Sequence, residues 1–468
     1  MSPAPVTGPG GPPRGSALIV VLWLMAILTL LMYAFLAEMQ VEYALAGGFA
    51  EGKKAEQLAW SAVDLACATV LASTSPQHKL DEPWSHDPDR FFEVPLGEGA
   101  FTLVHPVYDE GNVVMRWGLE DEASKININY APREVLLRLP RVTEEIADSL
   151  IDWRDADSNA GPSGAEDSYY QGLNPPYSCK NQPFETLEEL LLVRGVTAEV
   201  LYGEDTNLNG RLDPNEDDGD KTSPRDNGDG RLDPGLFAFV TVVSADTNLT
   251  NGGKTRVNLN TANDQQLGQA GFTPEEVLAI NMYRLNRLRN APGQPPFPNT
   301  AYLLDILAPR RFREVADAVT VVEGDRLPGL VNVNTAPKAV LLALPGITEE
   351  MAVKIMEYRT QSGVDLSNIG WLGEVLQPKE VQAVASFVTT RSNQFRIHAV
   401  GRIGTPYANI GTDGEEARPR AFRRMIAIFD KLSQPRPRLL YWKDATRLGM
   451  PYDPEEGPAP SNSRVTGR

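Results

Sequence analysis

The chain carries near its start the uncharged apolar run ALIVVLWLMAILTLLMYAFLA, residues 17–37, which ends at Glu38. At 1.5 Å per residue, a helix of these 21 residues is about 30 Å long, which matches the hydrocarbon core of a bilayer. The apolar core of a cleavable secretory signal is shorter, about 7–15 residues. The run therefore predicts one membrane-spanning helix.

Charges on the two sides of this run predict its orientation. Arg14 precedes the run, whereas Glu38 and Glu42 follow it. Because positively charged flanks stay in the cytoplasm, the short leader is predicted to be cytoplasmic. The remaining residues, about 430 of them, then lie on the outer side of the membrane.

Small and apolar residues continue beyond the membrane run in AEQLAWSAVDLACATVLA, residues 55–72. One face of this segment is marked at helical spacing by Ala59, Ala62, Val63, Ala66 and Val70. We expect a single helix over residues 16–72. Its first half lies in the membrane, and its second half packs on a globular domain.

Three later segments of the chain resemble one another. They begin at Ile128, Leu259 and Val333. Each contains an extended start with Asn, a first helix, a tight link and a second helix that ends at Arg. The predicted N-cap residues of the second helices are Thr143, Thr273 and Thr348.

This pattern resembles the helix-hairpin-helix family, most closely in the third copy, which has Leu-Pro-Gly-Ile at residues 344–347. Members of that family usually bind the DNA backbone through hairpin amides. In this chain Thr replaces the second hairpin glycine in all three copies, and Glu follows each cap within two residues. Carboxylates there occupy the positive helix end that a phosphate would need. We therefore expect the copies to pack a helical domain.

Segments with strand character lie on both sides of the repeats, at residues 91–121 and 395–444. They predict an α+β fold, in which a long N-terminal helix packs on an antiparallel sheet that is interrupted by a large inserted α-helical domain. The predicted divisions are a leader (1–15), the N-terminal helix (16–72), the two parts of the sheet domain (73–121 and 393–448), the inserted domain (122–392) and a disordered tail (449–468).

The sharpest local motif is DTNLNGRLDPNE, residues 205–216, which satisfies the calcium-loop pattern D-x-[DN]-x-[DN]-G-x5-E. Oxygen atoms from six positions would bind the ion, and Gly210 would make the turn. The candidate ligands are Asp205, Asn207, Asn209, the Arg211 carbonyl, Asp213 and Glu216. We therefore predict a structural Ca²⁺ in this loop.

A second loop, DNGDGRLD at residues 226–233, repeats the Gly-Arg-Leu-Asp-Pro element. It has Arg225 at the first ligand position and no Glu at the twelfth. Its candidate ligands are Asp226, Asn227, Asp229 and Asp233. Independent calcium binding and a solvated acidic loop both stay open at this point.

A third acidic cluster lies in WRDADSNAGPSGAEDSYY, residues 153–170. Its acidic residues are Asp155, Asp157, Glu166 and Asp167. Carboxylates crowded in a glycine-containing loop repel one another unless a cation lies among them. This segment is therefore a further candidate metal site.

Composition limits other functions. The 468 residues include 44 Lys and Arg against 62 Asp and Glu, a net charge of −18, so the surface repels phosphate backbones and nucleic acid is not expected as a partner. Two cysteines, Cys67 and Cys179, cannot form a four-thiolate site, and whether they pair stays open. No hydrolase, metalloprotease, P-loop or dinucleotide motif occurs, which predicts a non-enzymatic protein.

The leader resembles that of type IV pilins and pseudopilins, in which a basic residue and Gly precede the apolar helix, as in Arg14-Gly15-Ser16. The resemblance implies that prepilin peptidase cuts after Gly15 and that Ser16 is methylated. Most family members have Glu at the fifth mature position, where this chain has Val20. The absence of that Glu is typical of the large minor subunit of type II secretion systems, general secretion pathway protein K.

A pseudopilin sheet interrupted by a helical domain is also the architecture of the protein K family. The W-x-D-x-D and G-A-E-D-x-Y-Y stretches of residues 153–170 resemble a part of that family's helical domain that lies near bound calcium. The resemblance therefore implies that Asp155, Asp157, Glu166 and Asp167 are ligand candidates.

The same resemblance implies a function. The chain would be a single-pass protein of the bacterial inner membrane, with its N-terminus cytoplasmic and its C-terminal domain periplasmic. It would join other minor pseudopilins to initiate or cap the pseudopilus for protein export across the outer membrane, in about one copy per tip. The expected contact with those partners is the helix face with Ala59, Ala62, Val63 and Ala66.

Two other functions stay open. A membrane-anchored DNA receptor of the competence type would use the helix-hairpin-helix copies, although basic charge is missing from their hairpins. An exported hydrolase would use an acidic site, and the carboxylate clusters are the only sequence feature that supports this function.

Overall fold

A computed structural model describes residue 5 and residues 16–73, 75, 77–109, 112–219, 221–404, 419–432 and 437–452. The predicted cleavage residue Gly15 and residues 453–468 of the predicted tail lie outside the described residues. The chain divides into two compact units, residues 1–54 and residues 55–468. The predicted sheet and inserted domain thus belong to one unit.

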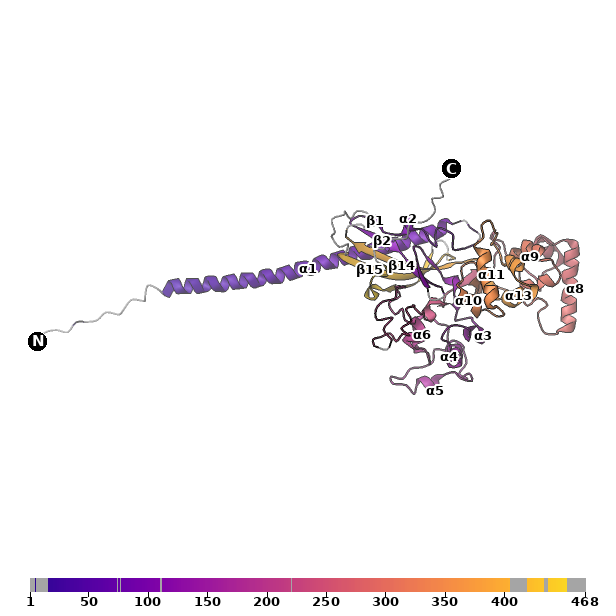
Figure 1. The fold of residues 1–468 in the computed structure, drawn as a ribbon, viewed down its shortest axis with the longest axis horizontal. Coiled ribbons are helices and arrows are strands. Elements are labelled where there is room, and N and C mark those ends of the chain that lie inside the picture. Colours follow the sequence, from indigo (N-terminus) through magenta and orange to yellow (C-terminus); the bar gives the residue numbers. More distant parts are fainter. Residues whose placement is uncertain are drawn as a thin grey trace, which may run out of the picture. The chain divides into compact units, whose positions relative to one another are not determined.

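Helix α1 (Ser16–Ala72) is a single helix, as the apolar pattern predicts (Figure 1). Its residues 18–50 have exposed side chains, including Leu22 and Leu30 at 59% and 69%. Among the described residues this is one helix long and apolar enough to cross a membrane. The predicted membrane-spanning segment is therefore supported by length and composition.

The second half of α1 packs directly on the sheet. Ala55 and Ala59 are fully buried there, and a Cβ on Gly401 of strand β14 would lie 2.1 Å from Ala55 O and 2.5 Å from Ala59 N. Backbone therefore meets backbone, which only small residues on both elements allow.

This packing corrects the expected partner contact. Ala59, Ala62, Val63 and Ala66 are at most 4% exposed because they lie in the core between α1 and the sheet. The expectation that this face binds other subunits is wrong. The prediction that this face packs the second half of the helix on the globular domain is confirmed.

The main sheet is antiparallel and has the order β1-β2-β14-β15-β16, with β5 also paired to β14. Its strands are β1 (Val94–Leu96), β2 (Gly99–Leu103), β5 (Glu120–Asp121), β14 (Gln394–Ile403), β15 (Ala421–Asp430) and β16 (Arg438–Asp444). Strands from before and after the inserted domain thus share one sheet, which confirms the predicted fold class.

The end of the sheet domain extends beyond the predicted boundary. Tyr452 is 6% exposed, and its hydroxyl donates to Glu93 Oε1 at 2.7 Å and accepts from Thr102 Oγ1 at 2.9 Å. Residues 449–452, which the sequence places in the tail, therefore belong to the sheet domain.

Shorter strand pairs surround the sheet. A hairpin joins β3 (His105–Asp109) to β4 (Asn112–Arg116), and β8 (Ala245–Thr247) pairs with β11 (Arg326–Pro328). Three parallel pairs close the three repeats, namely β6 (Ile126–Asn127) with β7 (Val240–Thr241), β9 (Val257–Asn258) with β10 (Val319–Thr320), and β12 (Val331–Asn332) with β13 (Val388–Thr389). The first and last strands of each repeat therefore lie side by side.

Figure 1 shows the helices of the inserted domain in two groups, α3 to α6 and α8 to α13. The α-helices are α2 (Pro88–Phe91), α3 (Arg133–Leu136), α4 (Glu144–Arg154), α5 (Asp167–Tyr170), α6 (Ala198–Tyr202), α7 (Asp264–Gln269), α8 (Pro274–Asn290), α9 (Pro309–Val315), α10 (Lys338–Ala343), α11 (Glu349–Arg359), α12 (Leu372–Val375) and α13 (Pro378–Val384). Short 3-10 helices are η1 (Glu122–Ser124), η2 (Glu188–Leu192), η3 (Leu236–Ala238), η4 (Thr300–Asp305), η5 (Ala316–Ala318), η6 (Ile369–Trp371) and η8 (Thr446–Leu448).

The repeats use the predicted cap and closing residues. Thr143, Thr273 and Thr348 each accept a hydrogen bond from a backbone N–H three residues later. The guanidinium groups of Arg154, Arg284 and Arg359 each donate to two carbonyl oxygens at the start of their own repeat. Those acceptors are Ile128 and Ala131, Leu259 and Ala262, and Val333 and Ala336. The predicted threefold repeat is confirmed.

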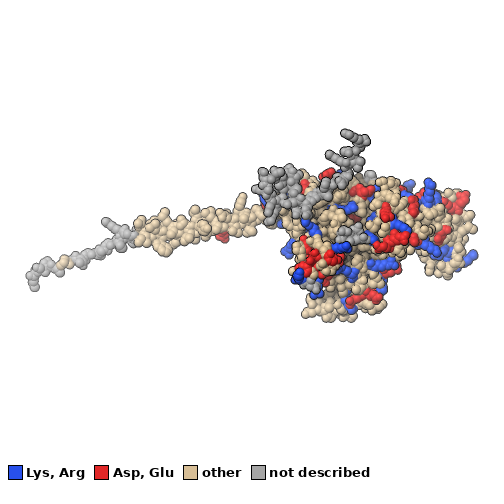
Figure 2. Space-filling view, viewed as in Figure 1, with Lys and Arg blue, Asp and Glu red and all other residues tan. Residues whose placement is uncertain are grey.

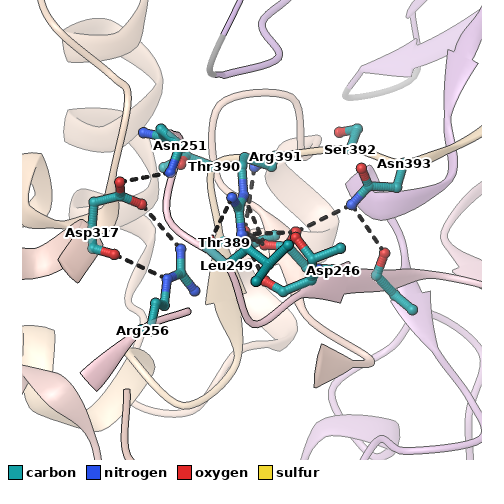
Figure 3. A network of polar contacts seen from close by, with 12 residues as sticks. Asp246, Leu249, Asn251, Arg256, Asp317, Thr389, Thr390, Arg391, Ser392 and Asn393 are labelled. Atoms are coloured by element: carbon teal, nitrogen blue, oxygen red, sulfur yellow. Dashed lines mark hydrogen bonds and ion pairs between the residues drawn. The ribbon is translucent and has the colours of Figure 1, made fainter. Parts of the chain in front are cut away.

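A buried ion pair connects β8, which precedes the second repeat, to the segment that follows the third repeat (Figure 3). Arg391, just after β13, donates to Asp246 Oδ2 at 3.1 and 3.2 Å and to Leu249 O at 2.8 Å. Thr389 and Asn393 donate to the same carboxylate at 2.7 and 3.1 Å. Asp246 is 2% exposed, so its charge requires these partners.

The contact between α1 and β14 predicts the effect of one methyl group. We expect Gly401→Ala to lower the free energy of unfolding by about 1–3 kcal/mol or more, because its Cβ would overlap the backbone of α1. The matched control is Gly268→Ala in α7, where a Cβ meets nothing within 4 Å. Thermal unfolding of the full chain in detergent measures both. Equal melting temperatures for the two variants would contradict the direct packing.

Candidate metal centre

Three carboxylates of the predicted acidic cluster come together at the end of α4. Asp155 follows α4, Asp157 lies in the next loop, and Glu166 immediately precedes α5. One oxygen of each side chain lies within 4.8 Å of the others. The negative end of the α4 dipole lies next to them and adds to their repulsion.

Part of this cluster is buried without hydrogen bonds. Glu166 is 4% exposed. Apart from the Cys179 thiol, a weak donor beside Glu166, its two carboxylate oxygens and Asp155 Oδ1 have no hydrogen-bond partner among the described residues. Burial raises the pKa of Glu166, and the charges of Asp152 and Asp155 raise it further. Burial, and then Asp157, raises the pKa of Asp155. Unpartnered carboxylate oxygens are ligands that a hard cation prefers, so the three residues fit a calcium ion.

The fourth predicted residue of the cluster, Asp167, is placed differently. Its side chain is exposed, and Oδ1 accepts a hydrogen bond from Cys179 N at 2.7 Å. It is not part of the three-carboxylate group.

Cys179 and Cys67 are both free thiols, which answers the question whether they pair.

Two acidic residues of α4 that the sequence analysis did not single out shape the same loop. A Cβ on Gly164 would lie 1.9 Å from Asp152 Oδ2, so the loop closes over Asp152 only because glycine is there. Asp148 receives a hydrogen bond from Arg133 Nε at 2.5 Å, which offsets its charge. Asp148, Asp152 and Asp155 follow one face of the helix, and this spacing could have identified them.

The first predicted calcium loop, residues 205–216, is closed by its first and last acidic residues. Asp205 Oδ1 accepts a hydrogen bond from Asn209 N at 2.9 Å, and Asp205 Oδ2 accepts one from Gly210 N at 2.8 Å. Glu216 Oε2 accepts one from Asp213 N at 3.1 Å. Gly210 has φ +67°, which explains why glycine is required at the turn.

Side-chain and backbone N–H groups of this loop donate to its own oxygens. Asp213 Oδ2 accepts hydrogen bonds from the side-chain amides of Asn207 and Asn209 at 2.7 and 2.9 Å, and Asn209 Oδ1 accepts one from Arg211 N at 2.6 Å. Glu216 is 1% exposed, and its Oε1 has no hydrogen-bond partner among the described residues. Burial raises the pKa of Glu216 to about 7, with contributions from Asp205 and Asp213. The donor set and the unpartnered buried oxygen fit a cation.

Groups outside the motif hold this loop on the sheet domain. Tyr108 Oη, on β3, donates to Asp205 Oδ2 at 2.5 Å. Arg424, on β15, donates to Asn207 O at 2.9 Å and to Leu208 O at 2.5 Å. The sequence analysis missed Tyr108 and Arg424, because no local pattern connects them to the loop.

The second loop is more exposed than the first. Asp226 Oδ1 accepts hydrogen bonds from Gly219 N and Gly228 N at 2.8 Å, and Asp229 Oδ1 accepts one from Arg231 N at 2.9 Å. Asp233 Oδ2 accepts one from the side-chain amide of Asn227. Figure 2 shows acidic side chains gathered over the loops beside α6. Both loops therefore concentrate negative charge in one region.

Comparisons with known proteins identify the segment that contains the first cluster. Residues 131–202, which include α3 to α6, match the family model for type II secretion system (T2SS), protein K. This segment, which we refer to as the protein K domain, is similar to that family. The predicted family resemblance is thereby confirmed.

Curated relatives carry the same family name. Type II secretion system protein K of Aeromonas hydrophila is 29% identical over 201 residues, which are 40% of this chain and 60% of that protein. The protein of the same name from Klebsiella pneumoniae is 29% identical over 198 residues, 40% of this chain and 59% of that protein. The chain thus spans about three fifths of the length of these relatives.

Two further similarities concern other parts of the chain. Residues 329–389 match the family model for the helix-hairpin-helix motif, which confirms the resemblance of the third repeat. Among solved structures, the GspK-GspI-GspJ complex of the type 2 secretion system from enterotoxigenic Escherichia coli has a chain with a TM-score of 0.39 and 15% sequence identity, covering 87% of this chain and 99% of that chain.

The protein K domain contains the Asp155, Asp157 and Glu166 cluster, whereas the two loops lie beyond it. The match ends at residue 202, before the first loop begins at Asp205. The two candidate metal regions are therefore adjacent in sequence, and the first of them lies within the residues that match this family model.

Repulsion within the protein K domain predicts the effect of removing one charge. In the presence of a chelator, we expect Glu166→Gln to raise the free energy of unfolding by about 1 kcal/mol, because the side-chain size is kept and one of three crowded charges is removed. Thermal unfolding of the full chain in detergent with EDTA measures this.

The matched control is Asp167→Asn, which also removes one charge but lies outside the group. It should leave the melting temperature nearly unchanged. A lower melting temperature for Glu166→Gln in EDTA would show that the carboxylate stabilises the metal-free protein and would contradict the repulsion.

Proposed function

We propose that this chain is a non-enzymatic minor pseudopilin of a type II secretion system that initiates or caps the pseudopilus. The observation that carries the proposal is a protein K domain inserted into a sheet on which the long helix α1 packs. By family resemblance the chain is anchored in the inner membrane, with a cytoplasmic N-terminus, a periplasmic globular part and a leader removed after Gly15 by prepilin peptidase.

The lateral partners in this proposal are other minor pseudopilins. Because the Ala59 face of α1 is buried against the sheet, the contacts fall to residues 18–50, where apolar side chains remain exposed. Apolar helices of several subunits would pack there within the membrane and at its surface.

Position at one end of the fibre is supported by Val20 and by the inserted domain. In an apolar bundle a carboxylate at this position would need a neighbouring amine as its partner, since an unpaired charge is costly. Val20 needs no such partner, so an end position with no further subunit suits it. The insertion between β5 and β14 would also collide with neighbours if it were repeated along a thin shaft.

We expect label on the inserted domain to be found at one end of assembled pseudopili, in about one copy. Electron microscopy of fibres with a tag at an exposed loop of the inserted domain measures this. Fibres that carry the same tag on the main shaft subunit are the control and should be labelled along their length. Label from this chain spread along the shaft would contradict the proposed position.

We also propose that calcium is bound at the Asp155, Asp157 and Glu166 cluster and in the first loop. The support is chemical: unpartnered buried carboxylate oxygens in both places and a donor set of carboxylates and amides. When bound, the ion offsets the carboxylate charges, and the residues of the chain hold the loops closed around it.

Calcium should therefore stabilise the folded chain. At a free concentration 100 times the Kd, one site adds about 2.7 kcal/mol. We expect Glu216→Gln to lose part of the calcium-dependent rise in melting temperature, because one charged oxygen of a bidentate ligand is removed. Glu275→Gln, an exposed residue of α8, is the matched control and should keep the full rise. A melting temperature of the wild-type chain that does not respond to calcium or chelator would contradict the proposal.

The helix-hairpin-helix match suggests DNA binding as a second function, but the charges of the third repeat do not support it. In the third repeat, Glu349 and Glu350 lie in the first turn of α11, and Glu349 pairs with Lys338 while Glu350 pairs with Lys354 at 2.6 Å. Negative charge thus lies where a phosphate would have to bind. We therefore propose a packing role for this motif.

A further inference from the structure

The two acidic loops have the same internal hydrogen bonds. We align the first loop, residues 205–216, with residues 225–236, so that Asn207, Asn209 and Asp213 correspond to Asn227, Asp229 and Asp233. The residue at position 5 donates its N–H to the Asn side chain at position 3, at 3.0 Å in the first loop and 2.9 Å in the second. The position 3 amide donates to the Asp at position 9 at 2.7 and 3.2 Å. The second loop therefore has the conformation of the first.

The second loop lacks two ligands in its own sequence. Position 1 is Arg225, and position 12 is Leu236, which is 1% exposed in the core. A calcium loop needs carboxylates at both positions, because position 1 anchors the turn and position 12 supplies two oxygens. If the loop binds an ion, these carboxylates must come from elsewhere in the chain.

Asp217 occupies the place of the missing position 1. In the first loop Gly210 N, at position 6, donates to Asp205 Oδ2 at 2.8 Å. In the second loop the equivalent Gly230 N donates to Asp217 Oδ1 at 3.0 Å. Asp217 thus makes with the second loop the hydrogen bond that Asp205 makes with the first.

Glu204 occupies the place of the missing position 12. In the first loop Asp213 N, at position 9, donates to Glu216 Oε2 at 3.1 Å. In the second loop the equivalent Asp233 N donates to Glu204 Oε2 at 2.8 Å. Glu204 is 2% exposed, so its carboxylate is held in the interior as that of Glu216 is.

The two pairs Glu204-Asp205 and Glu216-Asp217 therefore each provide one carboxylate to each loop. Neighbouring residues are only about 3.8 Å apart at their Cα atoms, so the two loops are coupled through both pairs. Glu216 lies close enough to Asp205 and Asp213 for their charges to raise its pKa, and its buried Oε1 has no hydrogen-bond partner among the described residues. Residues 204–233 contain ten acidic and four basic residues, so the excess charge exceeds what one divalent ion offsets.

We propose that the two loops form one paired site for two calcium ions, in which Asp217 and Glu204 supply positions 1 and 12 of the second loop. The inference rests on the proposed calcium binding of the first loop and extends it to a second ion. The other ligands of the second ion are Asn227, Asp229 and Asp233, so its donor set matches that of the first except that Asp229 replaces Asn209 at position 5.

Counting ions in single-charge variants tests this proposal. Calcium bound to the full chain in detergent is measured by equilibrium dialysis against calcium alone, for the wild type, Asp217→Asn, Glu204→Gln and the control Asp218→Asn. Asp217 is exposed, so its substitution leaves the core intact, whereas Glu204 is buried. Asp218 is adjacent in sequence, but its carboxylate binds Thr222 outside both loops.

We expect Asp217→Asn and Glu204→Gln each to lower the affinity for one calcium ion about tenfold or more, since each removes a charged ligand. Asp218→Asn should bind as the wild type does. Asp217→Asn together with Glu216→Gln should lose two ions relative to the wild type. Because Asp217→Asn keeps the fold, it decides the matter even if Glu204→Gln unfolds.

Two results would overturn different statements. If Asp217→Asn binds as many ions as the wild type with unchanged affinity, while Glu216→Gln loses one, the second ion is refuted and the first loop stands. If Glu216→Gln also binds as the wild type does, the proposed calcium binding of the first loop is refuted as well. The proposed place of the chain in the pseudopilus is tested separately by fibre labelling.

Discussion

Strand β14 must pair along both of its edges, and this requirement controls how the chain can accommodate its insertion. One edge pairs with β2 and β5, which precede the inserted domain, and the other pairs with β15. The domain therefore leaves the sheet at β5 and returns at the neighbouring β14. At this junction Arg396 Nε, on β14, donates to the buried Glu122 Oε1 at 2.5 Å. The burial of both charges is tolerated because they pair.

Periodicity and capping predicted most of the fold. The apolar and small-residue pattern gave the full extent of α1, and the Thr caps and closing Arg residues located the second helix of each repeat. The prediction that other subunits bind the Ala59 face was wrong. A stripe of small residues indicates close packing but does not indicate which element packs on it. Gly401, which decides the matter, is more than 300 residues away in sequence.

In the candidate site, too, local sequence patterns predicted some residues and contacts between distant residues determined the others. Asp155, Asp157 and Glu166 could be found from their motif, and the first loop from its spacing. Asp167 was included by its position in the motif, yet its carboxylate binds the backbone of Cys179. Asp217 and Glu204 could not be found, because they reach the second loop from outside its twelve residues. Only the hydrogen bonds to Gly230 and Asp233 reveal them.

Under the proposed calcium binding, the first loop connects metal binding to the orientation of the whole insertion. Tyr108 on β3 and Arg424 on β15 hold the loop from two different elements of the sheet domain, while Asp205 takes part in the loop itself. An ion that closes this loop also fixes the groups that contact Tyr108 and Arg424. Because binding to the folded state alone adds to stability, the junction of insertion and sheet would gain rigidity only where calcium is supplied.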